Sequence, residues 1–325
     1  MDVVLDEKQR LGADIHLANA KEQVERTLRG EIRAPVVRSF FDEPTFTATH
    51  VVHDPATKKA AIIDSVMDFD QAAGRISFES AEQIIDYVKA GGLTVDWLLE
   101  THAHADHLSA APILQEKLGG RLAIGKKIRT VQEVFGKIFN EGTDFARDGS
   151  QFDRLFLDGD RFELGAIPAI ALHVPGHTPA DMAYIIGNAA FVGDTLFMPD
   201  YGTARADFPG GDAHQLYKSI RRLMALPAET RVFLCHDYKA PNRDEFVWET
   251  TVGAERTGNV HVHEGVDEEA FVAMRKARDE TLGMPRLILP SIQVNMRAGH
   301  LPEPEANGTR YLKIPLDALP YAVWD

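Results

Sequence analysis

The sequence predicts a mixed α/β fold, and two features of the chain carry this prediction. Short apolar segments typical of strands alternate along the chain with segments of helical periodicity. In addition, a histidine-rich run from His102 to His107 directly follows one of the apolar strand segments. Ligand sites of α/β proteins generally lie at the carboxyl ends of strands. We therefore expect an α/β domain with its chemistry on the loops that follow its strands.

The opening part of this domain is predicted to be a β-meander followed by a helix and a buried strand. The apolar runs of the meander are 36–37, 46–52 and 60–63, the helix is 80–90, and the strand is 95–99. A helix over 108–118 follows the histidine-rich run. Further on, we expect strands at 169–174, 182–186, 189–192 and 231–234, and helices at 213–225 and 269–281.

The chain is predicted to have three regions. Residues 1–33 form an N-terminal appendage, in which the pattern from Leu5 to Gly30 indicates one or two helical turns. Residues 34–258 form the catalytic domain. Residues 259–325 form a C-terminal extension, and its apolar block from Leu287 to Met296 is expected to pack against the domain or a partner subunit.

Composition limits the partners of the protein. The 325 residues include 49 acidic and 35 basic ones, and the net charge of −14 opposes attraction to nucleic-acid phosphates and anionic membranes. The single cysteine, Cys235, excludes an intramolecular disulfide, and the N-terminus lacks the features of a signal peptide. No apolar run approaches the ~20 residues that cross a bilayer. We expect a soluble cytoplasmic protein that binds neither nucleic acid nor membrane.

The histidine-rich run indicates a metal site. Four potential ligands, His102, His104, Asp106 and His107, fall within six residues, and only small alanines separate them. Imidazole and carboxylate ligands together suit zinc, iron(II) or manganese. A solvated histidine loop is the structural alternative. The position of the run directly after a buried strand favours metal binding.

Three distant residues follow other strand patterns in the same way. They are His177 in the sequence Val-Pro-Gly-His-Thr, Asp194 in Phe-Val-Gly-Asp-Thr, and His236 in Phe-Leu-Cys-His-Asp-Tyr. Each alone is more often a hydrogen-bonded core or turn residue. Because all three share the strand-end position of the first run, we expect all seven residues to converge on one site.

The order of these motifs resembles the metal motifs of the metallo-β-lactamase superfamily, and the resemblance covers about residues 34 to 240. It implies an αββα sandwich with the metal site at one edge of two facing sheets. The alternation of strands and helices along the chain agrees with such a fold. Fold alone does not identify the reaction.

The resemblance leaves two chemistries open. In a zinc hydrolase, His102, His104 and His177 would hold one zinc, Asp106, His107 and His236 the second, and Asp194 would bridge the two ions. Water activated by the zinc ions would attack a thioester or lactone carbonyl, as in glyoxalase II or a lactonase.

In a persulfide dioxygenase, His102, His177 and Asp194 would bind a single iron(II) per chain, which leaves positions for a thiol-type substrate and O2. His104, Asp106, His107 and His236 would then lie in the outer shell and orient water and the ligands. Asp106 is the expected catalytic residue of this set.

The segment from Met198 to Gly211 favours the dioxygenase. It resembles the Gly-x-Arg-x-Asp-Phe stretch of persulfide dioxygenases at Arg205, Asp207 and Phe208, although the glycine is not matched, and it is also similar to bacterial β-lactamase-like hydrolase proteins of sulfide-responsive operons. The resemblance implies that Arg205 and Tyr238 contact glutathione. From residue types alone, Arg205 could instead pair with Asp207, and Tyr238 could be structural.

We therefore predict an enzyme that oxidises glutathione persulfide to sulfite and glutathione and that forms a homodimer, with a two-zinc hydrolase as the alternative. Three residues beside the motifs have expected supporting roles. Thr178 is expected to bond a metal ligand or a neighbouring backbone group, and Asp237 to tie down the adjacent loop. Cys235 is expected to be a buried, inert thiol.

Overall fold

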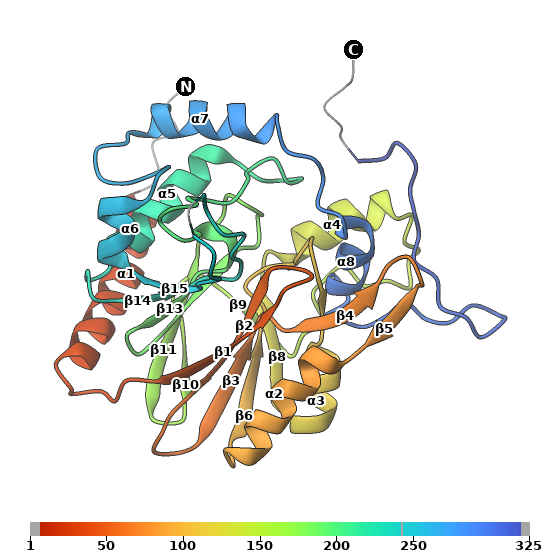
Figure 1. Ribbon diagram of the computed structural model, residues 1–325, viewed down its shortest axis with the longest axis horizontal. Helices are drawn as coiled ribbons and strands as arrows, with labels where there is room; N and C mark the ends of the chain where they lie inside the picture. The colour runs from red at the N-terminus through yellow and green to blue at the C-terminus, as the bar shows by residue number, and fades with distance from the viewer. Residues whose placement is uncertain (1–6, 242, 320–325) are drawn as a thin grey trace.

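The computed structural model describes residues 7–241 and 243–319, with side chains from Ile15 onward. Two six-stranded sheets face each other, and helices cover their outer faces (Figure 1). The first sheet has the order β1 (Val36–Asp42), β2 (Thr47–His53), β3 (Lys59–Ile63), β6 (Thr94–Leu99), β8 (Arg121–Gly125) and β9 (Arg154–Phe156). Its first three strands are antiparallel, and β3, β6, β8 and β9 run parallel.

The second sheet has the order β10 (Asp160–Leu164), β11 (Ile167–His173), β12 (Met182–Ile186), β13 (Ala189–Phe191), β14 (Arg231–Phe233) and β15 (Glu249–Thr251). It is antiparallel except where β13 pairs with β14. A small third sheet joins β5 (Arg75–Ser77), β4 (Val66–Asp70) and β7 (Leu108–Ser109).

Alternate side chains of the central strands belong to different cores. In β3, Ile62 faces the core under the helices, whereas Ile63 faces the core between the sheets. In β11, Leu172 faces the helices and Ala171 faces the opposite sheet. This alternation follows from the two-residue period of a strand. The structure thus confirms the expected αββα sandwich.

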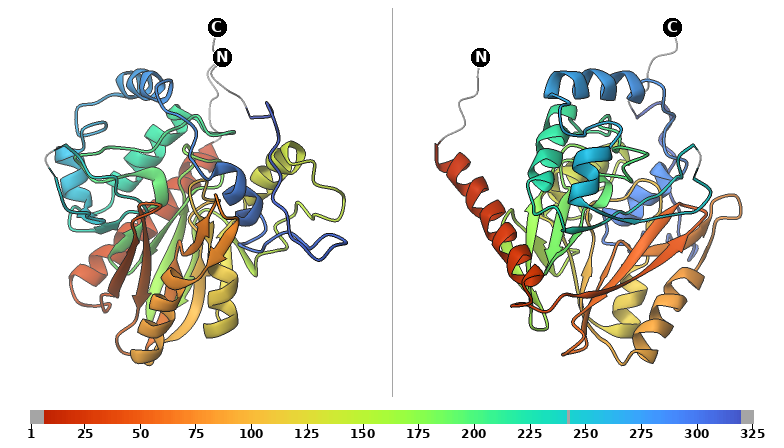
Figure 2. Two further views of the ribbon diagram at one scale, coloured as in Figure 1. Left: turned by 45° about the vertical axis from the view of Figure 1, so that its right-hand side comes forward. Right: turned by 60° about the vertical axis from the view of Figure 1, so that its left-hand side comes forward.

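The helices form the two outer layers (Figure 2). Helices α2 (Glu79–Ala90), α3 (Ala111–Leu118) and α4 (Ile128–Ile138) pack on the first sheet. Helices α1 (Glu7–Leu28), α5 (Ala213–Met224) and α6 (Val252–Gly258) pack on the second. Farther out, α7 (Glu268–Asp279) packs on α5, and α8 (Ile288–Asn295) packs on β7. No helix in the described ranges is long and apolar enough to cross a membrane.

Two of the predicted elements differ from the sequence expectation. Helix α1 extends over 22 residues and not one or two turns. Its narrow apolar stripe, including Ala20 and Val24, is buried against the second sheet, and Gln23 donates to the carbonyl oxygens of Ile185 and Gly187. The helix expected over 108–118 begins only at Ala111, because the preceding residues pair with β4 as a short strand. In both elements, tertiary contacts determine where the helix begins and how long it is.

Four strands deliver their following loops to one end of the sandwich. These strands are β6, β11, β13 and β14, and the loops carry the candidate ligands. Gly193, in the short 3-10 helix η1 (Gly193–Thr195), has a φ of +53°, and a Cβ there would lie 2.6 Å from Oγ1 of Thr101. Glycine therefore lets the loop after β13 approach the loop after β6 closely.

Candidate metal centre

The structure brings all seven sequence-predicted ligands together. They come from the four loops described above, and six of them are buried, with side chains no more than 9% exposed. Asp106 is the exception, since 23% of its side chain is exposed. The seven residues form two groups. The first ligand group consists of His102, His177 and Asp194, and the second of His104, Asp106, His107 and His236.

The first ligand group is spaced around a gap. Oδ2 of Asp194 lies 3.9 Å from Nε2 of His102 and 3.6 Å from Nε2 of His177. The potential ligand atoms of the three residues all lie within 4.8 Å of one another. The result is a two-histidine, one-carboxylate arrangement, which is suited to a single metal ion.

The second ligand group is more closely paired. Nε2 of His236 lies 2.9 Å from Oδ2 of Asp106, and Oδ1 of Asp106 lies 3.3 Å from Nδ1 of His107. Oδ1 of Asp194 lies 3.4 Å from Nε2 of His236 and so connects the two groups. Asp194 is therefore placed to serve either group.

Hydrogen bonds fix the orientation of the histidines in the first group. Nδ1 of His177 donates to the carbonyl oxygen of Arg205 at 2.8 Å. Nδ1 of His102 lies 3.0 Å from Oγ1 of Thr101, which itself donates to Asp64 and is thus free to accept. In both rings the Nε2 lone pair is left to face the site. Such outer contacts set the tautomer of a ligating histidine.

Two buried carboxylates orient His104 so that its Nε2 atom, and not its Nδ1 atom, makes the hydrogen bonds. Its Nε2 donates to Oδ1 of Asp64 at 3.0 Å and lies 3.2 Å from Oε2 of Glu100. Asp64 also accepts from the backbone N–H of Thr101 at 2.7 Å. Nδ1 of His104 is therefore the atom available to a metal. Asp64 and Glu100 were not predicted from the sequence, although each lies at the end of an apolar strand segment, which is the signal that identified the other residues.

Asn295 in α8 holds the histidine-rich loop from outside. Its amide donates to the carbonyl oxygens of His104 and His107, at 2.8 Å each, and its side-chain oxygen accepts from the backbone N–H of Ser109. The sequence offered no motif for this residue. The contact shows that the C-terminal segment supports the metal-binding loop.

Burial and neighbouring charges shift the pKa values of these residues in opposite directions. Burial, together with the charge of His104, lowers the pKa of His107 to about 4. Burial also opposes protonation of His236, but Asp106 and Asp194 outweigh it and raise the pKa to about 9. Burial raises the pKa of Asp194. Buried imidazole and carboxylate groups in such proximity are typical of a metal or catalytic site.

The donor atoms fit a metal ion. Among the candidate ligands, the buried atoms without a hydrogen-bond partner in the described ranges include Nε2 of His102, Nδ1 of His104, Nε2 of His107 and Oδ1 of Asp194. A buried polar atom without a partner costs about 1–3 kcal/mol. Divalent cations accept such lone pairs directly. The residues present thus match a metal centre in both chemistry and direction.

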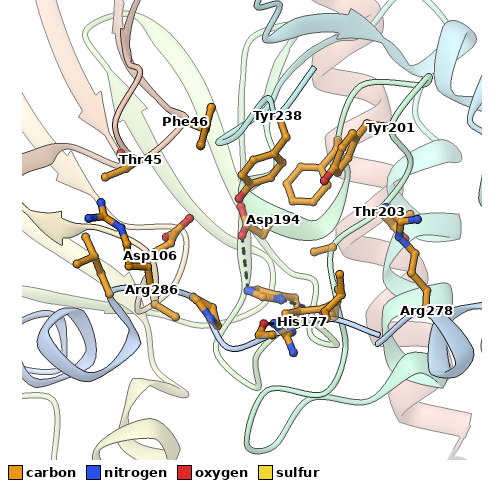
Figure 3. A pocket seen from close by; sticks show the side chains of 18 of the residues that line it. Thr45, Phe46, Asp106, His177, Asp194, Tyr201, Thr203, Tyr238, Arg278 and Arg286 are labelled. Carbon is orange, nitrogen blue, oxygen red and sulfur yellow. Dashed lines mark hydrogen bonds and ion pairs between the residues drawn. The ribbon is translucent and has the colours of Figure 1, made fainter. Parts of the chain in front are cut away.

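A pocket of about 310 Å³ opens onto the metal centre. Asp106, His177 and Asp194 form its floor (Figure 3). Aromatic side chains form one wall, with the rings of Tyr201 and Tyr238 5.3 Å apart. The segment that joins α7 to α8 also lines the pocket. Mostly apolar walls with a few polar groups are typical of small-molecule sites.

The two expected substrate-contact residues both line this pocket. The guanidinium of Arg205 makes two bonds to Asp207, at 2.5 and 2.7 Å, and Nη1 donates to the carbonyl oxygen of Gly283 at 2.7 Å. Tyr238 stacks on His236, and its phenol points toward Asp194 (Figure 3). Burial and the charges of Asp106 and Asp194 raise the pKa of Tyr238, so the phenol keeps its proton. Arg205 has N–H groups to spare for a ligand.

The supporting residues take defined positions. The hydroxyl of Thr178 donates to Asp181 and accepts from the backbone N–H of Ala180 at 3.2 Å, so it bonds a neighbouring backbone group and not a metal ligand. Asp237 receives both terminal nitrogens of Arg243, at 2.6 Å each, and also the backbone N–H of Val247, so it ties down the loop that follows His236. Cys235 is buried, and burial raises the pKa of its thiol. A neutral thiol is a poor nucleophile.

Comparisons with known proteins agree with this geometry. The sequence model of the family described as Metallo-beta-lactamase superfamily matches residues 43–236. A probable metallo-hydrolase of Burkholderia pseudomallei is 57% identical over 293 residues, which cover 87% of this chain and 99% of the relative. The mitochondrial persulfide dioxygenase ETHE1 of Bos taurus is 29% identical, over 82% of this chain and 90% of its own length.

A solved structure is also similar. The crystal structure of ETHE1 from Myxococcus xanthus superposes with a TM-score of 0.65 at 29% sequence identity. The match covers 82% of this chain and all of the other. Curated relatives thus include one with a hydrolase name at high identity and one with a dioxygenase name at lower identity.

Proposed function

The chain belongs to the metallo-β-lactamase superfamily, and we propose that it is an iron-dependent persulfide dioxygenase. In the proposed reaction, glutathione persulfide, O2 and water give glutathione, sulfite and two protons. One contrast between the two ligand groups carries the proposal. The ligand atoms of the first group are spaced around a gap, whereas Asp106 and His236 of the second group are already in contact.

The distances support a single metal ion. Ligand atoms about 2.1 Å from one ion lie roughly 3.0–3.5 Å from each other in common geometries. The separations of 3.6 and 3.9 Å in the first group leave room for an ion between the atoms. Nε2 of His236 and Oδ2 of Asp106, at 2.9 Å, have the spacing of a direct ion pair and can satisfy each other without a second ion. We infer that the second group orients the first and positions water.

Bound iron(II) would supply the redox chemistry at His102, His177 and Asp194. Asp106 is the proposed catalytic residue, because its carboxylate lines the pocket and is partly exposed. From there it can accept a proton from water as sulfite forms. Tyr238 and the remaining N–H groups of Arg205 are the proposed substrate contacts at the wall.

The second candidate is a hydrolase with two zinc ions per chain that cleaves a thioester or a lactone. Two observations favour it. Nε2 of His107 in the second group is buried without a hydrogen-bond partner in the described ranges, as a second ion would require. In addition, the Burkholderia relative at 57% identity is named a probable metallo-hydrolase.

The metal and the substrate separate the two functions. We would purify the protein without oxygen and measure iron and zinc per chain by elemental analysis. Oxygen uptake would then be followed with glutathione persulfide, and hydrolysis with a thioester and a lactone in parallel. We expect close to one iron per chain and oxygen uptake that yields sulfite. Two zincs per chain with hydrolysis and no oxygen uptake would establish the hydrolase.

Three related proposals accompany this function. The chain divides functionally at 33/34 and 258/259, it works in the cytoplasm, and it forms a homodimer. Light scattering of the purified protein tests the last of these, since a molar mass of one chain, 36.0 kDa, would exclude the dimer.

A further inference from the structure

Four arginines line the pocket, and two of them are neutralised by carboxylates. Arg205 is held by Asp207, as described above. Nε of Arg275 donates to Asp279 at 2.9 Å, and its Nη1 donates to the carbonyl oxygen of Thr203 at 3.1 Å. The charges of these two guanidinium groups are neutralised within the pocket wall, although Arg205 keeps N–H groups for a ligand.

The other two arginines, Arg278 and Arg286, are exposed and have no carboxylate partner in the part of the chain that the structure describes. Arg278 lies in the last turn of α7, with its guanidinium 5.9 Å from the ring centre of Tyr201. Arg286 lies in the segment between α7 and α8. In a chain of net charge −14, two unpaired cations in one pocket indicate an anionic ligand.

The two arginines stand on opposite sides of the metal centre. Figure 3 shows Arg286 on the side of Thr45 and Asp106, and Arg278 on the side of Tyr201 and Thr203. His177 and Asp194 lie between them (Figure 3). In this view, a ligand that reaches both cations passes over His177 and Asp194.

We propose that Arg278 and Arg286 form a two-ended anion clamp that selects substrates with a carboxylate at each end and a sulfur in the middle. A γ-glutamyl-cysteinyl-glycine derivative has this form, because its two carboxylates flank the cysteine sulfur. The inference rests on the proposed function in taking the ligand to be a glutathione derivative. Guanidinium groups bind carboxylates through paired, charge-assisted hydrogen bonds.

The clamp comes from the segment that follows the residues matched by the family model, 43–236. Its two arginines belong to α7 and to the connection from α7 to α8, and Arg205 fixes that connection through the carbonyl oxygen of Gly283. The backbone of Arg205 also accepts the hydrogen bond of His177. Arg205 thus links the position of a metal ligand to the position of the clamp.

Binding of S-methylglutathione, which cannot be oxidised as a persulfide, tests the clamp. The ligand would be titrated by calorimetry into the metal-loaded protein and into its Arg278→Gln and Arg286→Gln variants. We expect each variant to bind roughly tenfold more weakly or worse, because a charge-assisted bond is lost. Arg161→Gln is the matched control, since Arg161 is an exposed arginine on β10 that does not line the pocket.

The S-methylglutathione monoethyl ester, which lacks the glycine carboxylate, assigns the two ends. We expect the ester to bind the unaltered protein more weakly than the free acid does. The difference in affinity between the free acid and the ester should disappear in the variant that has lost the arginine contacting the glycine carboxylate. It should persist in the other variant. An equal ester effect in the unaltered protein and in both variants would overturn the clamp. Because this readout needs no oxygen uptake, a failure of the dioxygenase proposal would be seen separately.

Discussion

The two ligand groups have nearly the same chemistry but different surroundings. The first group has its histidines oriented by a backbone carbonyl and a hydroxyl, and its carboxylate stands 3.6 Å or more from either ring. The second group contains a direct contact of 2.9 Å between Asp106 and His236. Residue types alone therefore do not decide which residues bind the metal. The contacts around each side chain do.

His104 shows how much the surroundings matter. It lies two residues from His102, yet Asp64 and Glu100 together hold its Nε2 atom. Despite complete burial, these carboxylates raise the pKa of His104 well above its ordinary value. In His102, burial and the nearby charge of His104 lower the pKa instead. Adjacent histidines of one motif are thus prepared for different roles.

The largest effect is expected from Asp194→Asn, because its carboxylate lies 3.6 Å from His177 of the first group and 3.4 Å from His236 of the second. Loss of its charge should remove most of the bound metal and lower kcat/KM by about a thousandfold, since a metal ion contributes several kcal/mol to catalysis. Metal analysis and steady-state kinetics measure the two effects, and circular dichroism checks the fold. Retention of both metal and activity would show that Asp194 is not a ligand.

The next test compares His102→Ala with His236→Ala. If only the first group binds the metal, His102→Ala should lose the iron. His236→Ala should retain one metal per chain and lose roughly 10- to 100-fold in activity, as is usual for an orienting residue. Elemental analysis of both variants, prepared in parallel, gives the answer. A fall from two metals to one in His236→Ala would identify the second group as a zinc site.

The convergence of the seven candidate ligands was predictable because each follows an apolar strand, and because four of them lie within six residues. The mixed α/β class was predictable because strands and helices alternate along the chain, whereas the αββα arrangement was implied by the resemblance to the metallo-β-lactamase superfamily. The length of α1 was underestimated, because this helix with its weak apolar stripe is stabilised only through burial against the second sheet. Local pattern does not reveal such tertiary stabilisation.

The supporting residues were not predictable from local pattern. Asn295 is 191 residues from His104 in sequence, and no motif indicates that its amide holds the carbonyl of that residue. The same is true of Arg278 and Arg286, which look like ordinary surface arginines in the sequence. Only the fold places them beside the metal centre. The ion pair of Arg205 with Asp207 was an open alternative, and the structure contains it.

A smaller effect is expected from Asp64→Asn. The neutral amide would no longer hold His104 by charge, and it would leave either the backbone N–H or the hydroxyl of Thr101 poorly satisfied. We expect metal affinity to fall by about tenfold and the free energy of unfolding by about 2 kcal/mol. Metal titration and denaturant unfolding measure these quantities.

Asp68→Asn is the control for this variant. Asp68 also accepts hydrogen bonds, from the backbone N–H and the hydroxyl of Ser80, but it lies on β4 outside the metal centre. It should reduce stability without changing metal affinity. If both variants reduced metal affinity equally, the role assigned to Asp64 in orienting His104 would be wrong.

The smallest effect is expected from Tyr238→Phe, which tests the pocket and leaves both ligand groups intact. The change removes only a hydroxyl, and no other described residue depends on it for a hydrogen bond. Because a single hydrogen bond contributes about 0.5–1.5 kcal/mol, we expect KM for glutathione persulfide to rise two- to tenfold while kcat and metal content stay nearly unchanged. Tyr217→Phe is the control, since its hydroxyl donates to Val266 outside the pocket. A fall in kcat with KM unchanged would instead place the phenol in the chemical step, and the wall of aromatic residues would then be part of the catalytic machinery.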